Sequence, residues 1–152
     1  MTRELFGQLL TIDHITGMKD SSGDVYSLGL YFSGGRKPVI FEGEDTVLLY
    51  GLLAGACGGI GAAYNIIPQL FVKLWNAFQA KDFDLAAHTQ LHINELIKAL
   101  LVVARFAGIK QTLAWMGLPS GEPRTPNRPL TEPEEITLRA SLGPVGFFAG
   151  GG

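Results

Sequence analysis

The sequence has little cysteine and little charge. Its 152 residues include one cysteine, Cys57, so an internal disulfide framework is excluded. Charged residues make up 17% of the chain and the formal net charge is −2, without the positive excess typical of nucleic-acid-binding proteins. Cys57 stands among small apolar residues, which predicts an unreactive, buried thiol. We therefore expect no nucleic-acid partner and a reducing, cytoplasmic location.

The sequence also lacks the marks of a secretory signal and of a membrane span. Met1-Thr-Arg-Glu is not followed by a long apolar stretch, so we expect no signal peptide. Residues 47–72 carry no charge and are long enough to cross a bilayer. That segment also holds five glycines and Pro68, which is typical of a helix, a strand and a second helix separated by turns. We predict that it lies in a protein core and that the chain has no membrane partner.

Apolar residues amount to 47% of the chain, which indicates a packed globular fold, and the order of its segments predicts the α/β class. Strand and helix patterns alternate, which predicts parallel strands with right-handed crossovers, and the strands lack polar alternation, which predicts helices on both faces of the sheet. The predicted strands span 15–19, 39–42 and 58–64, and the predicted helices span 3–10, 24–32, 46–54 and 68–80. Further along, we predict a long amphipathic helix over 82–106, helices over 108–116 and 134–142, and a loose tail over 143–152.

Lys19 is the first candidate for chemistry, because it ends the apolar run Ile15-Thr-Gly-Met-Lys19. In parallel α/β folds, catalytic groups stand at the carboxyl ends of strands. Apolar surroundings and the N-terminus of a following helix, with caps offered by residues 20–22, would both disfavour the charged ammonium form. A neutral lysine is the nucleophile that forms Schiff bases with carbonyl substrates. The alternative is a surface lysine that reaches solvent from a strand end.

Other candidate motifs are weaker. Gly59-Ile-Gly61 follows a predicted helix rather than a strand, so it is not a dinucleotide fingerprint. Its glycines allow close approach of the backbone to a ligand, or tight strand packing. A group of acids, Glu42, Glu44 and Asp45, predicts a solvated rim and a helix cap. The scattered histidines lack a third ligand beside them, so we predict no metal site and no metal cofactor.

Four segments resemble the N-acetylneuraminate lyase / dihydrodipicolinate synthase family. They are GMKDSSGD at 17–24, GLLAGACGGIGAAYNIIPQLF at 51–71, GIKQTLAWMGL at 108–118 and RPL at 128–130. The resemblance implies a (β/α)8 barrel with a C-terminal helical extension, of which this chain would be the C-terminal half. Residues 1–81 would then hold the last three βα units, residues 82–142 the extension and residues 143–152 a flexible tail.

The resemblance also implies a reaction and a site. Family members cleave or form C–C bonds through a Schiff base with pyruvate, and they need no other cofactor. The family's Schiff-base lysine falls on Lys19. The family's substrate-binding positions fall on Ser21, Gly43, Asp45, Thr46, Ile60 and Gly61. The small-molecule partner would be pyruvate or a 2-oxo-3-deoxy acid, and complete members are homo-oligomers, typically tetramers.

Departures from the family pattern bear on the substrate and on activity. The later segments resemble the lyases of the family more than the synthases. In sialic acid lyases the position of Thr46 is typically glutamate and that of Ala62 is typically serine, so we expect a lyase-type member with a different or smaller 2-oxo acid. The N-terminal half, which would supply a carboxylate-binding loop and a proton-relay tyrosine, has no counterpart here. The chain is therefore interpreted as a fragment, a truncated product or a chain that depends on a partner. The alternative to an enzyme is a non-catalytic homologue that only binds or assembles.

Overall fold

The computed structural model describes residues 1–33 and 37–147, which form two compact units. The first unit consists of Met1–Gly61 and Lys73–Gln90, and the second of Ala62–Val72 and the residues from Leu91 onward. Within the described ranges, no helix is long and apolar enough to cross a membrane. The predicted division of the chain after residues 81 and 142 stays a prediction.

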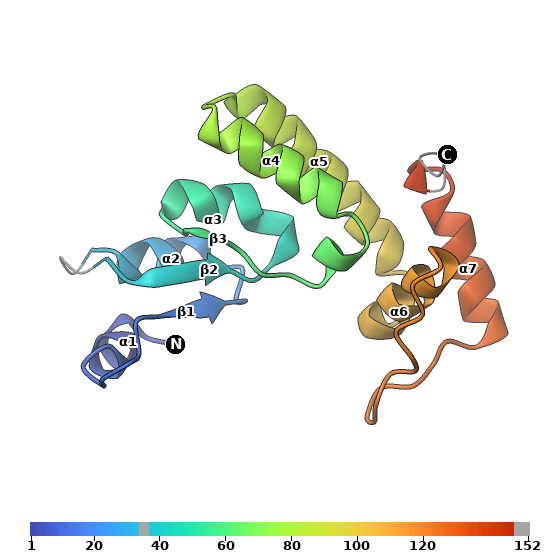
Figure 1. Ribbon diagram of the computed structural model, residues 1–152, viewed down its shortest axis with the longest axis horizontal. Coiled ribbons are helices and arrows are strands. Elements are labelled where there is room, and N and C mark those ends of the chain that lie inside the picture. The colour runs from blue at the N-terminus through green and yellow to red at the C-terminus, as the bar shows by residue number, and fades with distance from the viewer. Residues whose placement is uncertain (34–36, 148–152) are drawn as a thin grey trace. The chain divides into compact units, whose positions relative to one another are not determined.

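The first unit is built on a parallel sheet, as predicted. Its strands lie side by side in the order β1-β2-β3 (Figure 1). In the described part of the chain, β1 and β3 each pair with β2 alone. The elements in chain order are α1 (Arg3–Leu9), β1 (Gly17–Asp20), α2 (Val25–Tyr31), β2 (Val39–Glu42), the short 3-10 helix η1 (Asp45–Val47), α3 (Leu48–Ala54) and β3 (Gly58–Gly59). Parts of α4 (Pro68–Gln79) and α5 (Phe83–Leu100) complete the unit.

The strand register decides which side chains share a face of the sheet. Lys19 stands opposite Phe41, and Asp20 stands opposite Glu42. Because side chains alternate along a strand, Lys19 and Phe41 point to one face, while Asp20 and Glu42 point to the other. The carboxyl ends of β1 and β2 therefore present a lysine on one side and two acids on the other.

Only one face of this sheet is covered in the first unit, whereas the sequence predicted cover on both. Ile40 is fully buried in a cluster with Phe6, Leu28 and Tyr31 from α1 and α2, and Met18 packs against it. On the opposite face Val39 is 44% exposed, and Lys19 is exposed as well. The prediction that both faces are buried was wrong, because the helices in this cluster all pack on the face that carries Ile40 and Met18.

The second unit is helical. It contains the 3-10 helix η2 (Ala63–Asn65), the start of α4, the end of α5, α6 (Arg105–Trp115) and α7 (Glu132–Leu142). Leu138 and Leu142 of α7 are fully buried, and the Ser141 hydroxyl donates to the carbonyl of Ala99 at 2.7 Å. These contacts fix α7 against the end of α5, and a capping box starts α7 at Thr131.

Several predicted element boundaries were wrong. Lys19 is the third of four residues in β1, so Asp20 ends the strand. The third strand is two residues long rather than seven, and the long helix ends at Leu100 instead of residue 106. Asp24, not a residue of 20–22, caps α2 by accepting from the Ser27 amide. The predicted turn at 33–38 and the tail at 143–152 lie partly outside the described residues.

Candidate active site

Lys19, Ser21 and Gly43 converge at the carboxyl ends of β1 and β2. A Cβ atom placed on Gly43 would stand 2.5 Å from Cε of Lys19 and closer still to Oγ of Ser21. Real Cβ atoms essentially never approach other atoms to within 3.0 Å, and the backbone oxygen of Asp20 would also lie 2.8 Å away, so a side chain at position 43 requires the strand junction to shift. The Lys19 side chain therefore lies across the backbone of residue 43, and the structure brings together three residues that the family resemblance assigns to one site.

Backbone hydrogen bonds hold this junction together. The Gly43 amide donates to the Asp20 carbonyl at 2.6 Å, which extends the pairing of β1 and β2 by one residue. The Asp20 side chain accepts from the Ser22 amide at 2.9 Å and so shapes the turn that carries Ser21. Residues 19–22 and residue 43 are thus fixed relative to one another by bonds outside the regular strands.

Glu42 is a buried acid at the end of β2, where the sequence predicted a solvated rim. Its side chain is 3% exposed, and Oε1 accepts from the Glu44 amide at 2.9 Å. Burial raises the pKa of the Glu42 carboxyl, and the nearby charges of Asp20 and Glu44 act in the same direction. Hydrogen bonds from the amides of Glu44 and Gly43 oppose that rise. The other oxygen of Glu42 packs on Gly51 of α3, where an added Cβ would lie 2.6 Å away.

Asp45 and Thr46 follow Gly43 in the loop after β2. Asp45 is only 6% exposed, so it is buried rather than part of an open rim. The Thr46 hydroxyl donates to the Glu44 carboxylate at 2.8 Å. The Asp45 carbonyl accepts from the side-chain amide of Gln90 at 3.1 Å. This loop therefore has a defined conformation before any ligand binds.

Ile60 and Gly61 lie just beyond β3. The Ile60 amide donates to the carbonyl of Glu42 at 2.9 Å, so pairing with β2 continues past the two-residue strand. The Ile60 side chain is 48% exposed. The backbone at residue 60 thus lies at the carboxyl end of the strands, beside Glu42 and the loop that carries Gly43.

The structure differs from two expectations about single side chains. Lys19 is exposed, so it does not have the apolar surroundings predicted from the sequence. Cys57 was expected to be buried but is exposed, with its Sγ 3.2 Å from the Ile40 carbonyl. The exposure of Lys19 follows from the uncovered face of the sheet. Within residues 1–33 and 37–147, no group of three histidine, cysteine, aspartate or glutamate side chains could hold a metal ion.

Sequence reasoning missed Gln90, a polar residue that is 2% exposed on α5. A signal was present, because Gln90 shares a helical face with Ala86, Ile93 and Ile97, which are all buried. A glutamine on an otherwise apolar face needs hydrogen-bond partners inside the protein. Its partners here lie in the loop after β2 and in α3.

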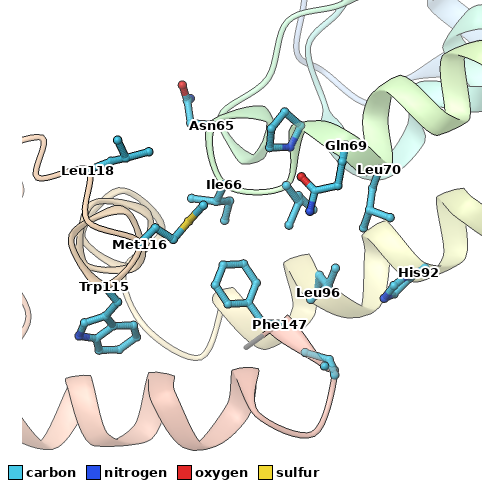
Figure 2. A pocket seen from close by; sticks show the side chains of 14 residues that line it. Asn65, Ile66, Gln69, Leu70, His92, Leu96, Trp115, Met116, Leu118 and Phe147 are labelled. Atoms are coloured by element: carbon cyan, nitrogen blue, oxygen red, sulfur yellow. The ribbon is translucent and has the colours of Figure 1, made fainter. Parts of the chain in front are cut away.

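A pocket of about 470 Å³ is lined by residues of the second unit, whereas the sequence-predicted site residues belong to the first. Figure 2 shows the side chains that line this pocket, with the ring of Phe147 turned toward Leu96 and Met116. The walls are mainly apolar, with His92, Asn65 and Gln69 as exposed polar members. The sequence did not predict this pocket because its walls come from four separate segments of the chain.

Comparison with known proteins identifies the family. Residues 1–143 match the Dihydrodipicolinate synthetase family. The chain belongs to this family. The match covers both units, so the resemblance carried by the sequence motifs is confirmed.

Individual relatives include lyases and synthases. The chain is 33% identical to N-acetylneuraminate lyase of Rhizobium meliloti over 138 residues, covering 91% of this chain and 46% of that protein. The structure of dihydrodipicolinate synthase DapA-2 from Bacillus anthracis superposes with a TM-score of 0.85 at 26% identity, over 93% of this chain and 49% of that one. The structure of a catalytic-lysine mutant of Ruminococcus gnavus sialic acid aldolase superposes with a TM-score of 0.86 at 26% identity. The superposition covers 95% of this chain and 48% of that one. The chain therefore spans about half the length of the relatives it matches.

Proposed function

We propose that the chain is the Schiff-base part of a pyruvate-dependent aldolase or lyase that acts on a 2-oxo-3-deoxy acid. In this proposal it forms the C-terminal part of a (β/α)8 barrel, with residues 82–142 as the helical extension, and it works as a homo-oligomer. The single observation that carries the proposal is the contact of Lys19 and Ser21 with Gly43. The Ruminococcus gnavus relative supports it, because that aldolase has a catalytic lysine.

The proposed reaction starts at Nζ of Lys19. The neutral amine attacks the keto carbon of the substrate, the keto oxygen leaves as water with both amine protons, and the imine takes up a proton from solvent. The imine draws the electron pair of the C3–C4 bond while a base takes the proton of the C4 hydroxyl, so an aldehyde leaves. The resulting enamine takes a proton at C3, and hydrolysis of the imine releases pyruvate and restores the amine. Ser21 and the backbone of Ile60 and Gly61 would lie near the pyruvate part.

We assign the other end of the substrate to Asp45 and Thr46. They follow Gly43 in a loop that hydrogen bonds hold in place, so their backbone is prepared for a ligand. Thr46 and Ala62 offer fewer polar atoms than the glutamate and serine typical of sialic acid lyases. The preferred substrate would therefore be lyase-type but with a shorter or less hydroxylated tail than sialic acid.

Borohydride trapping with pyruvate tests the proposal without requiring turnover. Reduction of the imine fixes pyruvate to the reacting lysine, and peptide mapping locates it. We expect one adduct, on Lys19, and its loss in Lys19→Ala. Lys73→Ala is the matched control, because Lys73 is an exposed lysine of the same unit on α4. An adduct that persists in Lys19→Ala contradicts the assignment.

The uncovered face of the sheet favours a second candidate function. Val39 is 44% exposed on the same face of the sheet as the exposed Lys19, which suits a chain that binds a 2-oxo acid or assembles without completing the reaction. Pyruvate trapping on Lys19 without any release of pyruvate from a 2-oxo-3-deoxy acid is the outcome expected for such a binding protein.

A further inference from the structure

Gln90 caps α3 from another helix. The first amides of a helix have no partner inside it, and a side chain at the N-cap usually accepts from one of them. In α3 the N-cap is Val47, which makes no side-chain cap bond. The Gln90 Oε1 atom accepts from the Leu49 amide instead, at 2.9 Å, across 41 positions of sequence.

The same side chain also fixes Asp45. Its Nε2 donates to the Asp45 carbonyl at 3.1 Å, so one buried amide bridges both ends of the turn from Asp45 to Leu49. A glutamine can do this because its side chain carries a donor and an acceptor. On the other side of the loop, Glu42 accepts from the Glu44 amide. The loop is therefore held between a strand-end acid and a residue of α5.

We propose that Gln90 is a positioning residue that sets the preference of the site for the tail of the substrate. It acts through Asp45, which the proposed function assigns to the aldehyde part, and this inference rests on that function. Lys19 and Ser21 have no bond to Gln90 among those described, and their position comes from β1 and its pairing with Gly43. Loss of Gln90 should therefore impair recognition of a long 2-oxo acid and leave imine formation with pyruvate unchanged.

The test compares borohydride trapping of the chain with two acids, pyruvate and 2-keto-3-deoxygluconate. The readout is the ratio of the concentrations that give half-maximal adduct. Gln90→Leu removes both bonds, and we expect it to reduce the preference for the longer acid about tenfold. Gln90→Glu keeps an acceptor for Leu49 but loses the donor to Asp45, so it should reduce the preference as well. Gln90→Glu also provides the comparison with wild type if the Gln90→Leu protein fails to fold.

Thr89→Val is the matched control. Thr89 is the preceding residue of α5, it is 4% exposed, and its hydroxyl bonds only within the helix, to the Leu85 carbonyl at 2.7 Å. Thr89→Val should leave the half-maximal concentrations of both acids unchanged. In an Asp45→Ala background, Gln90→Leu should have a smaller effect on the ratio, since the proposed route passes mainly through the Asp45 side chain.

Each outcome bears on a different claim. If Gln90→Leu weakens trapping of both acids equally, Gln90 has only a structural role and the inference is overturned. An unchanged ratio in the presence of a Lys19 adduct overturns the inference and leaves the proposed function intact. If the wild-type chain traps neither acid on Lys19, the proposed function fails, and the role of Gln90 fails with it.

Discussion

The Cε atom of Lys19 lies 2.5 Å from the point that a Cβ atom of residue 43 would occupy. Gly43→Ala must therefore move the lysine side chain or the backbone beneath it. We expect the yield of trapped pyruvate to fall by about 10²-fold, because small misplacements of a reacting group are costly. Overpacking should also lower the free energy of unfolding in urea by about 1–3 kcal/mol.

Gly29→Ala is the control for this substitution. Gly29 lies in α2, and nothing stands within 4 Å of a Cβ added there. Alanine at that position should raise the free energy of unfolding by about 0.5–1 kcal/mol and leave trapping unchanged. Normal trapping by Gly43→Ala would remove Gly43 from the candidate site.

Glu42 should make stability depend on pH. Burial raises the native pKa of this carboxyl above its ordinary value of 4.5, so the folded state holds the proton more tightly than the unfolded state does. The free energy of unfolding should then fall as pH rises from 4.5 through the raised native pKa. Glu42→Gln keeps the acceptor for the Glu44 amide and should remove this slope in urea unfolding measured across that range. Glu95→Gln, an exposed site on α5, should retain it.

Glu134 should act in the opposite direction. Its carboxylate accepts from Arg128, from the Thr131 amide and from the Thr131 hydroxyl, and these bonds lower its pKa from 4.5 to about 2. The unfolded state therefore binds this proton more tightly, so the stabilisation is present above 4.5 and is lost as pH falls toward 2. Glu134→Gln should flatten the acid limb of the unfolding curve. Glu135→Gln, the neighbouring acid in the first turn of α7, should not.

The 152-residue chain by itself should turn over slowly. An imine-forming lysine needs donors for the substrate carboxylate and a positioned base, and a base contributes typically about 10²–10⁴-fold. The family resemblance assigns neither the carboxylate donors nor the base to a residue of this sequence. Pyruvate release from 2-oxo-3-deoxy acids should be measured together with the mass of the protein in solution. Rates of about 1–10³ per second, usual for enzymes, would contradict this expectation.

The central part of the sheet could be read from the sequence, and its edges could not. Residues 39–42 form β2 as predicted, because Val39-Ile-Phe-Glu42 is an apolar run with no competing pattern. The third strand is short because its glycines offer no side chains to pack on neighbours. The break after Leu100 was not detectable in the sequence, since apolar residues continue through it and the N-cap of α6, Ala104, makes no side-chain cap bond.

The candidate site divides in the same way. Lys19 was predicted from the rule that places chemistry at the ends of parallel strands, and Ser21 and Gly43 were predicted from the family resemblance. The structure brings these three residues together, and their roles stay predictions. The burial of Glu42 was missed because it depends on Gly51 of the following helix, and the bonds of Gln90 were missed because their partners lie 41 and 45 positions away. The Glu42 side chain packs in the space that a side chain at Gly51 would fill, and Gln90 donates a hydrogen bond to the Asp45 carbonyl. No local pattern encodes such a pairing.

The bond from Gln90 to the Leu49 amide also bears on the order of folding. Ribosomes make proteins from the N-terminus, so residue 49 is synthesised 41 positions before its capping partner. Until α5 arrives, the start of α3 can be capped only by water. Closing a loop of this length costs chain entropy before any bond repays it. The β2–α3 segment should therefore acquire native protection against hydrogen exchange only after α5 has docked.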